Sequence, residues 1–338
     1  MKKVTVIGPG SWGTALSMVL SDNGHEVRIW GNDPQQLSEI NEHHTNKKFL
    51  PEVVLPEQIK AYESLTEALD GVDTILLVVP TKVIRMVVQQ IGKIVTSPVT
   101  IVHASKGIEP RTSKRISELI MEEMPVHLLK DIVVLSGPSH AEEVAVRKLT
   151  TVTSASINLQ AAEAIQDLFM NHYFRVYTNP DVIGVELGGA LKNIIALGAG
   201  IIAGLGYGDN AKAALMTRGL VEITRLGCAM GAKKETFSGL AGMGDLIVTC
   251  TSIHSRNWRA GNMLGQGQSL DDILDKMGMI VEGVRTAEAA HILAKEKGIS
   301  MPITNAIYSV LFEGKNPKEM VGHLMGRVKT HEMEDVEV

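Results

Sequence analysis

Cysteine is scarce, aromatic residues are few, and positive charge is not in excess. The 2 cysteines, Cys228 and Cys250, have a spacing that fits neither a metal site nor a disulfide framework, and this usage suits a reducing cytosol. The 33 basic and 38 acidic residues give a formal net charge of −5. Nucleic-acid binders usually carry a basic excess, so this class is not favoured. The 11 histidines are scattered, so we expect no metal.

Long hydrophobic runs are also lacking. The longest spans 194–205, is interrupted by glycines, and falls short of the ~20 residues that cross a bilayer. Lys192 and Asp209 bracket this run, which favours a buried helix of a soluble protein. The first apolar run is too short for the core of a signal peptide. We therefore expect a cytoplasmic protein without membrane insertion.

The chain has 338 residues, which suggests about two domains. Its first half alternates short β-branched runs with helical patterns, which predicts a parallel sheet covered by helices on both sides. The expected strands are 4–7, 27–30, 74–79, 100–102, 132–135, 150–153 and 175–177. The expected helices are 14–20, 83–91, 113–124 and 159–169. This pattern predicts an α/β fold of the Rossmann-type, doubly wound class.

After Asn179-Pro180 the strand pattern fades, and glycine-rich turns separate helical stretches. We expect helices at 183–205, 211–230, 270–277, 286–297 and 303–312. The predicted organisation is a dinucleotide-binding domain over 1–179, an all-helical substrate domain over 180–330, and an acidic tail over 331–338.

A glycine-rich loop, Gly8-Pro9-Gly10-Ser11-Trp12-Gly13, follows the first strand and opens the first helix. In this context the first glycine allows a tight turn, the second lets the backbone approach a pyrophosphate, and the third lets the helix pack close to the strand. The free N–H groups of the helix N-terminus then favour an anion. Pro9 lacks an N–H, so Ser11, Trp12 and their neighbours must hold the phosphates.

The sequence leaves the choice between NAD and NADP open. Asp33 lies about 20 residues beyond the last glycine, where an acid binds the ribose 2′-OH of NAD. It also precedes Pro34, which is equally typical of a helix N-cap. Lys47 and Lys48 are candidates for contact with the 2′-phosphate of NADP.

Several motifs resemble the bacterial-type, NAD(P)-dependent glycerol-3-phosphate dehydrogenases, in the order of that family and over almost the whole chain. They are the stretches 8–16, 105–109, 136–139, 188–193, 239–246, 255–257, 281–283 and 301–303. The departures are Pro9, where alanine is usual, and His140, where phenylalanine is common. The resemblance implies reversible reduction of dihydroxyacetone phosphate to sn-glycerol 3-phosphate with NADH or NADPH, a product used in glycerophospholipid synthesis. It also implies a homodimer.

Lys192 is the candidate proton donor. It lies in an otherwise apolar helix, where desolvation lowers the pKa of a lysine towards neutrality. The alternative is a lysine that extends its amine to solvent at a helix start. The resemblance favours the catalytic role and implies that Lys106 and Asp245 tune the amine. Thr249 shares the site if its segment is helical.

Ser255-Arg256-Asn257 combines a planar guanidinium with neutral donors, a set that suits a phosphate. A helix cap with an exposed arginine is the alternative. The resemblance implies that these three residues hold the substrate phosphate. The other substrate contacts that the resemblance implies are Lys106, Gly137, Ser139, Lys192, Asn193 and Asp245. The cofactor contacts that it implies are Gly8, Gly10, Ser11, Trp12, Gly13, Asn32, Asp33, Phe49, Lys106, Ala141, Arg256, Ile280 and Glu282.

Two other functions stay open on the residues alone. A related two-domain dehydrogenase for a hydroxy acid or a branched keto acid also has a glycine loop and a catalytic lysine on a helix, but it has no need of a phosphate-binding set. A non-catalytic dinucleotide sensor would keep the glycine loop without needing Lys192 and Asp245.

Overall fold

The computed structural model of the chain describes residues 1–110, 112–278, 280–329 and 331–332, so most of the predicted acidic tail lies outside the described residues. Contacts divide the chain into two compact units. The first contains Met1–Ser105 and Ile116–Val182, and the second contains Lys106–Arg115 and Ile183–Val338. The segment Lys106–Arg115, here called the strap, thus packs with the second unit although its neighbours in sequence belong to the first.

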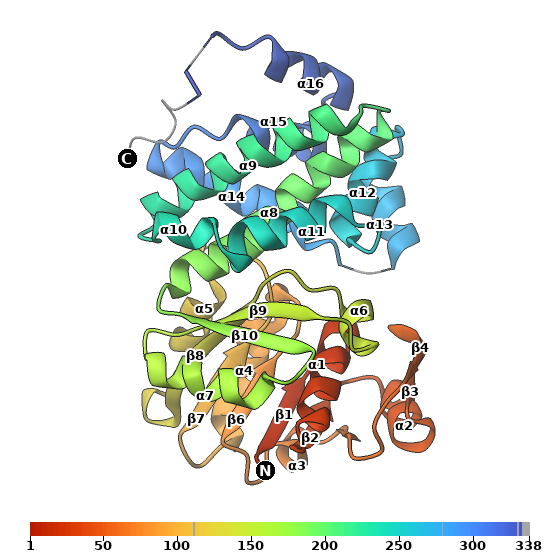
Figure 1. Cartoon of the computed structure of the whole chain (residues 1–338), viewed down its shortest axis with the longest axis vertical. Coiled ribbons are helices and arrows are strands. Elements are labelled where there is room, and N and C mark those ends of the chain that lie inside the picture. Colours follow the sequence, from red (N-terminus) through yellow and green to blue (C-terminus); the bar gives the residue numbers. More distant parts are fainter. Residues whose placement is uncertain (111, 279, 330, 333–338) are drawn as a thin grey trace. The chain divides into compact units, whose positions relative to one another are not determined.

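The first unit is built on an eight-stranded sheet (Figure 1). In spatial order its strands are β10 (Phe174–Asn179), β9 (Thr150–Ala155), β8 (Leu129–Ser136), β7 (Val99–His103), β6 (Thr74–Leu77), β1 (Lys3–Ile7), β2 (Glu26–Trp30) and β5 (Lys60–Tyr62). The strands β8, β7, β6, β1, β2 and β5 are parallel, so their carboxyl ends meet at one edge of the sheet. This confirms the Rossmann-type class, whose ligands bind at that edge.

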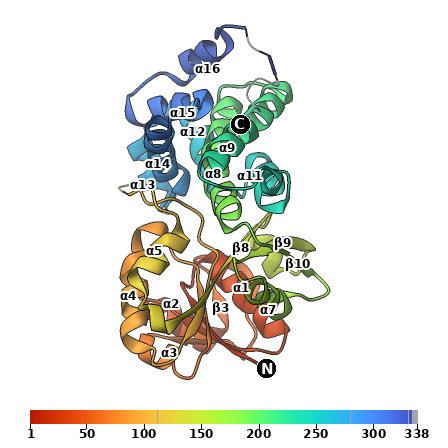
Figure 2. The ribbon, with the colours of Figure 1, turned by 90° about the vertical axis from the view of Figure 1, so that its left-hand side faces the viewer.

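The sheet is buried on both faces, because its strands are apolar at successive positions. Val4 and Val6 of β1 belong to one core cluster, and Ile7 belongs to the other. The first cluster includes residues of α1 (Ser11–Asp22), α2 (Pro34–His43), α6 (Ala141–Ala145) and α7 (Leu159–Phe169). The second includes residues of α4 (Ile84–Ile94) and α5 (Ile116–Glu123), and the short α3 (Leu65–Ala68) precedes β6. Figure 2 shows α4 and α5 on one side of the sheet and α1 and α7 on the other.

The expected all-parallel order fails at one pair of strands. β9 pairs with β8 antiparallel and with β10 parallel, so these last two strands run opposite to the others. The connection from β8 to β9 contains only the five-residue helix α6. A parallel crossover must carry the chain back along the sheet, usually in a longer helix, whereas the five residues of α6 span only about 7.5 Å, so the chain returns as an antiparallel strand.

Three strands of the first unit were missed from the sequence. Two of them, β3 (Thr45–Asn46) and β4 (Leu50–Val54), form a separate antiparallel hairpin, and the third is the edge strand β5. Each is short, and Pro51 and Pro56 interrupt the apolar pattern in this region. The hairpin nevertheless matters for the site, because it reaches the glycine loop.

The second unit is helical. Its helices are α8 (Val182–Gly204), α9 (Asp209–Ala229), α10 (Lys234–Phe237), α11 (Asp245–Thr251), α12 (Arg256–Gly265), α13 (Leu270–Met277), α14 (Glu282–Lys297), α15 (Pro302–Phe312) and α16 (Pro317–Met325). Buried Glu222 of α9 accepts hydrogen bonds from the N–H groups of Ile303 (2.6 Å) and Thr304 (3.0 Å), and so caps α15. Burial raises the pKa of this carboxyl group.

The apolar helix α8 forms the centre of this unit. Among the described residues it alone is long and apolar enough to span a membrane, but 89% of its most apolar window is buried in the protein, as in a core helix. It packs against α12 with backbones nearly touching. A Cβ atom at Gly200 would lie 2.0 Å from the carbonyl oxygen of Trp258, and one at Gly261 would lie 2.0 Å from that of Leu197. Gly200 and Gly204, which are four residues apart on α8, therefore allow the close packing of α8 against α12 within the protein.

Candidate active site

Lys192 lies in the middle of α8 with 5% of the residue exposed. Its Nζ donates a hydrogen bond to Oγ1 of Thr249 at 2.7 Å and makes a short ion pair with Oδ1 of Asp245. The amine therefore stays inside the unit, and the alternative of a solvent-directed lysine is wrong. The structure also confirms that Thr249 shares this site, because the segment is helical and Thr249 lies one turn after Asp245.

Asp245 is held by a tight turn. It follows the π-helical turn Leu240–Gly244 and starts α11. Gly188 of α8 lets this turn approach closely, because a Cβ atom there would lie 2.4 Å from the carbonyl oxygen of Ala241. Turns of this type often occur at functional sites. The glycines in the 188–193 and 239–246 motifs thus bring the carboxylate against the lysine.

The Asp245 carboxylate bridges two amines and is 0% exposed. Its Oδ1 contacts Lys192, and its Oδ2 accepts from Nζ of Lys106 at 2.6 Å. The Lys106 side chain is 18% exposed and comes from the strap. All three charged groups belong to the second unit. Two positive groups thus share one negative group in a largely buried site.

This arrangement lowers the pKa of Lys192 to about 7. The main cause is desolvation by burial, which disfavours the charged amine. The Asp245 carboxylate raises this pKa, and the nearby Lys106 amine lowers it. Burial also raises the pKa of the neighbouring Cys250 thiol to about 12, so this group stays neutral. A lysine with a pKa near 7 can both donate and accept a proton at neutral pH.

The Ser255-Arg256-Asn257 set lies at the N-terminus of α12. Ser255 is the N-cap and accepts from the N–H of Trp258 at 3.2 Å. Asn257 is buried, donates to Oδ1 of Asn193 at 2.9 Å, and accepts from the N–H of Gly283 at 2.9 Å. This contact links the start of α12 to the residue after Lys192. Part of the hydrogen-bonding capacity of Asn257 is therefore used within the protein.

Arg256 is exposed and donates to the carbonyl oxygen of Ile280 at 3.4 Å. Glu282 begins α14 two residues after Ile280. The structure thus brings together Arg256 and the 280–282 segment, two parts of the chain for which the resemblance implies cofactor contacts.

In the first unit the glycine loop has the geometry that a dinucleotide needs. Gly8 has φ +113°, and a Cβ atom at Gly13 would lie 2.0 Å from the carbonyl oxygen of Gly8. Both positions therefore require glycine. A Cβ atom at Gly10 would have nothing within 4 Å, so the start of α1 faces open space. The N–H groups of Ser11, Trp12 and Gly13 begin this helix, where an anion is stabilised.

The loop is anchored by residues that the sequence did not indicate. The carbonyl oxygen of Pro9 accepts from Nε2 of Gln36 at 2.6 Å and from Nδ2 of Asn46 at 2.9 Å. Asn46 is 0% exposed and also contacts Thr14 (2.8 Å) and Gln36 (3.0 Å). No sequence motif marks these residues, because they meet only when α2 and β3 pack beside the loop.

Asp33 is the N-cap of α2, with its Oδ1 accepting from the N–H of Gln36 at 3.4 Å. Its Oδ2 lies 3.6 Å from Nζ of Lys48, and both side chains are well exposed. Phe49 lies beside the loop, since its carbonyl oxygen accepts from Oγ of Ser11 at 3.2 Å. Asn32 precedes Asp33 and is exposed.

Gly137, Ser139 and Ala141 follow the carboxyl end of β8. Gly137 has φ +146°, and a Cβ atom there would lie 2.9 Å from the Cα atom of Val152. Its carbonyl oxygen accepts from Oγ of Ser139 at 3.0 Å, and α6 starts at Ala141. This tight turn lies at the same sheet edge as the glycine loop.

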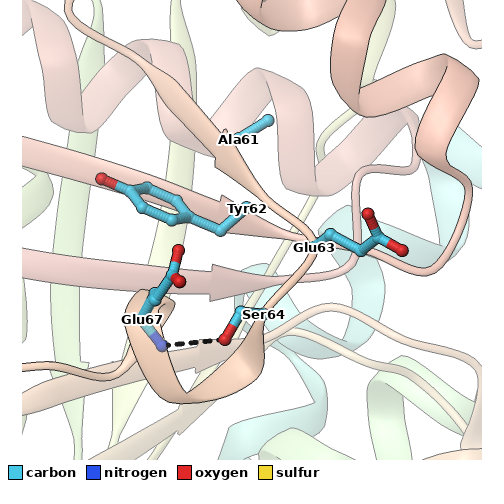
Figure 3. Close-up of a pocket in the computed structure, with 5 residues that line it drawn as sticks. All are labelled: Ala61, Tyr62, Glu63, Ser64 and Glu67. Carbon is cyan, nitrogen blue, oxygen red and sulfur yellow. Dashed lines mark hydrogen bonds between the residues drawn. The ribbon is translucent and has the colours of Figure 1, made fainter.

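A pocket opens beside the end of β5 in the first unit (Figure 3). It is lined by Ala61, Tyr62, Glu63, Ser64 and Glu67, and Ser64 caps α3 by accepting from the N–H of Glu67. None of these residues is a sequence-predicted site residue. Among the residues that the structure describes, no group of histidine, cysteine and acidic side chains has the arrangement of a metal site.

Comparisons with known proteins agree with this geometry. A model described as the N-terminus of NAD-dependent glycerol-3-phosphate dehydrogenase matches residues 3–162, and one described as its C-terminus matches residues 181–322. A glycerol-3-phosphate dehydrogenase (NAD(P)+) from Bacillus cytotoxicus is 68% identical over 99% of this chain and 98% of its own length.

Solved structures give the same result. The crystal structure of a glycerol-3-phosphate dehydrogenase from Coxiella burnetii has a TM-score of 0.92 at 38% identity, covering 96% of this chain and 99% of that one. A ketopantoate reductase from Ralstonia eutropha has a TM-score of 0.61 at 15% identity, covering 94% of this chain and 99% of that one. The second likeness concerns the fold alone.

Proposed function

The chain belongs to the NAD-dependent glycerol-3-phosphate dehydrogenase family, and we propose from this premise how its two units divide the reaction. The enzyme catalyses the reversible, NAD(P)H-dependent reduction of dihydroxyacetone phosphate to sn-glycerol 3-phosphate. The observation that carries our proposal for the second unit is the buried set of Lys192, Asp245, Lys106 and Thr249.

Residues 1–179 form the dinucleotide-binding domain in this proposal. The open space at Gly10, the constrained Gly8 and Gly13, and the N–H groups of Ser11 and Trp12 fit a pyrophosphate. Asn32, Asp33 and Phe49 contact the adenosine part of the cofactor in this proposal, which the hydrogen bond from Ser11 to the Phe49 carbonyl oxygen supports, and Ala141 is a further contact at the start of α6. When bound, the cofactor supplies or accepts the hydride.

Residues 180–330 form the substrate domain. Ser255, Arg256 and Asn257 hold the phosphate at the N-terminus of α12, supported by the positive end of the helix dipole. The Asn257–Asn193 hydrogen bond fixes this phosphate site relative to the turn of α8 that carries Lys192. Gly137 and Ser139 of the first domain are further substrate contacts, and Arg256, Ile280 and Glu282 are further cofactor contacts. These assignments follow the family motifs.

Lys192 gives the proton to the ketone oxygen while the carbonyl carbon is reduced, and in the reverse direction it takes the proton from the alcohol. Asp245 keeps the amine oriented and partly charged, and Lys106 prevents its pKa from rising too far. The Lys106 amine also polarises the carbonyl and contacts the substrate and the cofactor. After reduction the neutral Lys192 amine regains a proton from solvent.

The cellular setting belongs to the same proposal. The family resemblance supports a homodimer and a role of the product in glycerophospholipid synthesis. The 2 cysteines are both free thiols, which suits the cytoplasm. The partners of the chain are then small molecules, with neither nucleic acid nor a membrane.

The direct test is oxidation of NADH and NADPH with dihydroxyacetone phosphate, run side by side on the purified enzyme. We expect turnover with this substrate and none with hydroxy acids, branched keto acids or dihydroxyacetone lacking the phosphate. Turnover of a branched keto acid without activity on dihydroxyacetone phosphate would overturn the proposal.

A further inference from the structure

The strap Lys106–Arg115 has Lys106 at one end and, at the other, Arg115, which forms a buried ion pair with Glu186 of α8. We propose that Arg115 and Glu186 are positioning residues that hold Lys106 on the carboxylate of Asp245. This inference rests on the proposed function for the role of Lys106 itself. It adds two residues outside the motifs that carry the family resemblance.

The strap is closed on itself, so a constraint at Arg115 reaches Lys106. Ile108 and Arg115 form an antiparallel bridge, and the N–H of Glu109 donates to the carbonyl oxygen of Lys114 at 3.0 Å. Lys106 lies two residues before this bridge. Ile108 is 1% exposed and belongs to the apolar core cluster of the second unit. The two ends of the strap are therefore tied to each other and to that core.

The ion pair between Arg115 and Glu186 fixes the closed strap to α8. Nη1 of Arg115 lies 2.6 Å from Oε2 of Glu186, and their side chains are only 12% and 4% exposed. A buried pair of this kind is costly to break, because each charged group has lost hydration that the attraction of its partner offsets. The ion pair therefore holds the strap in one position against α8.

Glu186 and Lys192 lie on the same helix, six residues apart, which places them about 9 Å apart along its axis. Because α8 carries both the proton donor and the anchor of the strap, one rigid element sets the position of Lys106 relative to Lys192. The Lys106 side chain is long and flexible, and its own contact with Asp245 fixes only its end. The ion pair supplies the second fixed point.

Loosening the strap should change the titration of Lys192. The charged or titratable groups that act on this amine are Asp245 and Cys250 of α11 and Lys106 of the strap. Cys250 stays neutral, and Lys106 lowers the pKa of Lys192. When Lys106 moves away, the pKa of Lys192 rises. The pH above which reduction slows then moves to higher values.

The experiment compares Glu186→Gln and Arg115→Lys with the unaltered enzyme. We expect kcat/KM for dihydroxyacetone phosphate to fall about tenfold to hundredfold, because small displacements of reacting groups have effects of this size. We also expect the fall in rate at high pH to begin at higher pH. The same two substitutions in a Lys106→Met background should leave the pH dependence of that background unchanged, since the group they position is already absent.

Glu123→Gln is the matched control, because it removes an ion pair with Arg85 (2.5 Å) in the first unit and should leave both readouts unchanged. If Glu186→Gln does not fold, as judged by circular dichroism, the charge-conserving Arg115→Lys decides. An unaltered pH profile in a folded variant, or an equal further shift in the Lys106→Met background, overturns the proposal. Failure of the unaltered enzyme to reduce dihydroxyacetone phosphate would instead overturn the proposed function.

Discussion

Asp245 and Lys192 form an ion pair that is almost wholly buried, with the carboxylate 0% and the lysine 5% exposed. The same carboxylate accepts a hydrogen bond from Lys106 at 2.6 Å. Burial alone would drive the amine to its neutral form, and Asp245 opposes this change. The balance leaves a group that exchanges a proton at neutral pH, and the predictions below follow from it.

Titration of Lys192 should give the two directions of the reaction opposite pH dependences. Below the pKa of about 7 the Lys192 amine is protonated and can donate, and above it the protonated fraction falls about tenfold per pH unit. We therefore expect kcat/KM for reduction to fall above about pH 7, while oxidation of glycerol 3-phosphate becomes faster until the amine is neutral. Initial rates in both directions between pH 5.5 and about 9.5 measure this. Parallel profiles in the two directions would contradict it.

Asp245→Asn removes the charge that keeps Lys192 protonated. Because Asp245 raises the pKa of Lys192, its loss lowers that pKa, and reduction at neutral pH should slow by about 10²-fold to 10⁴-fold. Lower pH should restore part of the rate. Thr249→Val is the matched control: it removes a neutral hydroxyl that accepts from Lys192 and donates to the backbone carbonyl oxygen of Asp245, contacts worth about 1 kcal/mol each, and should slow the reaction only about fivefold to tenfold. Equal losses in both variants would argue against a role for the charge.

Much of the fold follows from the sequence, because buried parallel strands and helices leave strong apolar patterns. The helices α7 and α13 begin and end where the pattern predicts. The antiparallel direction of β9 could not be predicted, because the apolar pattern of a buried strand does not show whether it pairs parallel or antiparallel with its neighbour. The helices α10 and α11 were missed because four and seven residues show too little of the helical period, and α12 was missed because Gly261 and polar residues interrupt its pattern.

Some residues of the candidate site could also be predicted from the sequence, and others could not. Gly8, Lys192 and Asp245 could be predicted as site residues because they lie in motifs whose chemistry or family resemblance is specific. Asn46 and Glu186 were missed, since each acts through a partner distant in sequence, Pro9 and Arg115 respectively. A polar residue of this kind is indistinguishable from a surface residue until the chain has folded.

Asn46→Ala tests the anchoring of the glycine loop. It removes two hydrogen bonds to the loop and α1, so the Pro9 carbonyl loses one of its buried donors. We expect the KM for NAD(P)H to rise about tenfold, which corresponds to a loss of about 1.4 kcal/mol of binding free energy. The KM for dihydroxyacetone phosphate should change little. Asn41→Ala is the control, because Asn41 makes similar hydrogen bonds to Ala61 away from the loop. If both variants raise the KM for NAD(P)H equally, Asn46 does not anchor the glycine loop for cofactor binding.

Lys48→Glu tests the discrimination between cofactors. Lys48 lies 3.6 Å from Asp33 on a hairpin beside the glycine loop, so it is placed to offset the Asp33 charge and attract a 2′-phosphate. We expect kcat/KM for NADPH to fall about fivefold to tenfold more than that for NADH, a modest effect because the pair is exposed. Lys60→Glu adds the same charge change on the exposed edge strand β5 and should leave the ratio unaltered. An unaltered ratio in Lys48→Glu would exclude this lysine from cofactor selection.

The most direct test of the account is Lys192→Met, which keeps the length of the side chain and removes its amine. The variant should keep the circular dichroism spectrum of the unaltered enzyme and its affinity for NAD(P)H, while kcat for reduction of dihydroxyacetone phosphate falls about 10²-fold to 10⁴-fold and loses its pH dependence near 7. A folded variant that turns over the substrate at the normal rate, with the pH dependence retained, would contradict the assignment of Lys192 as the proton donor.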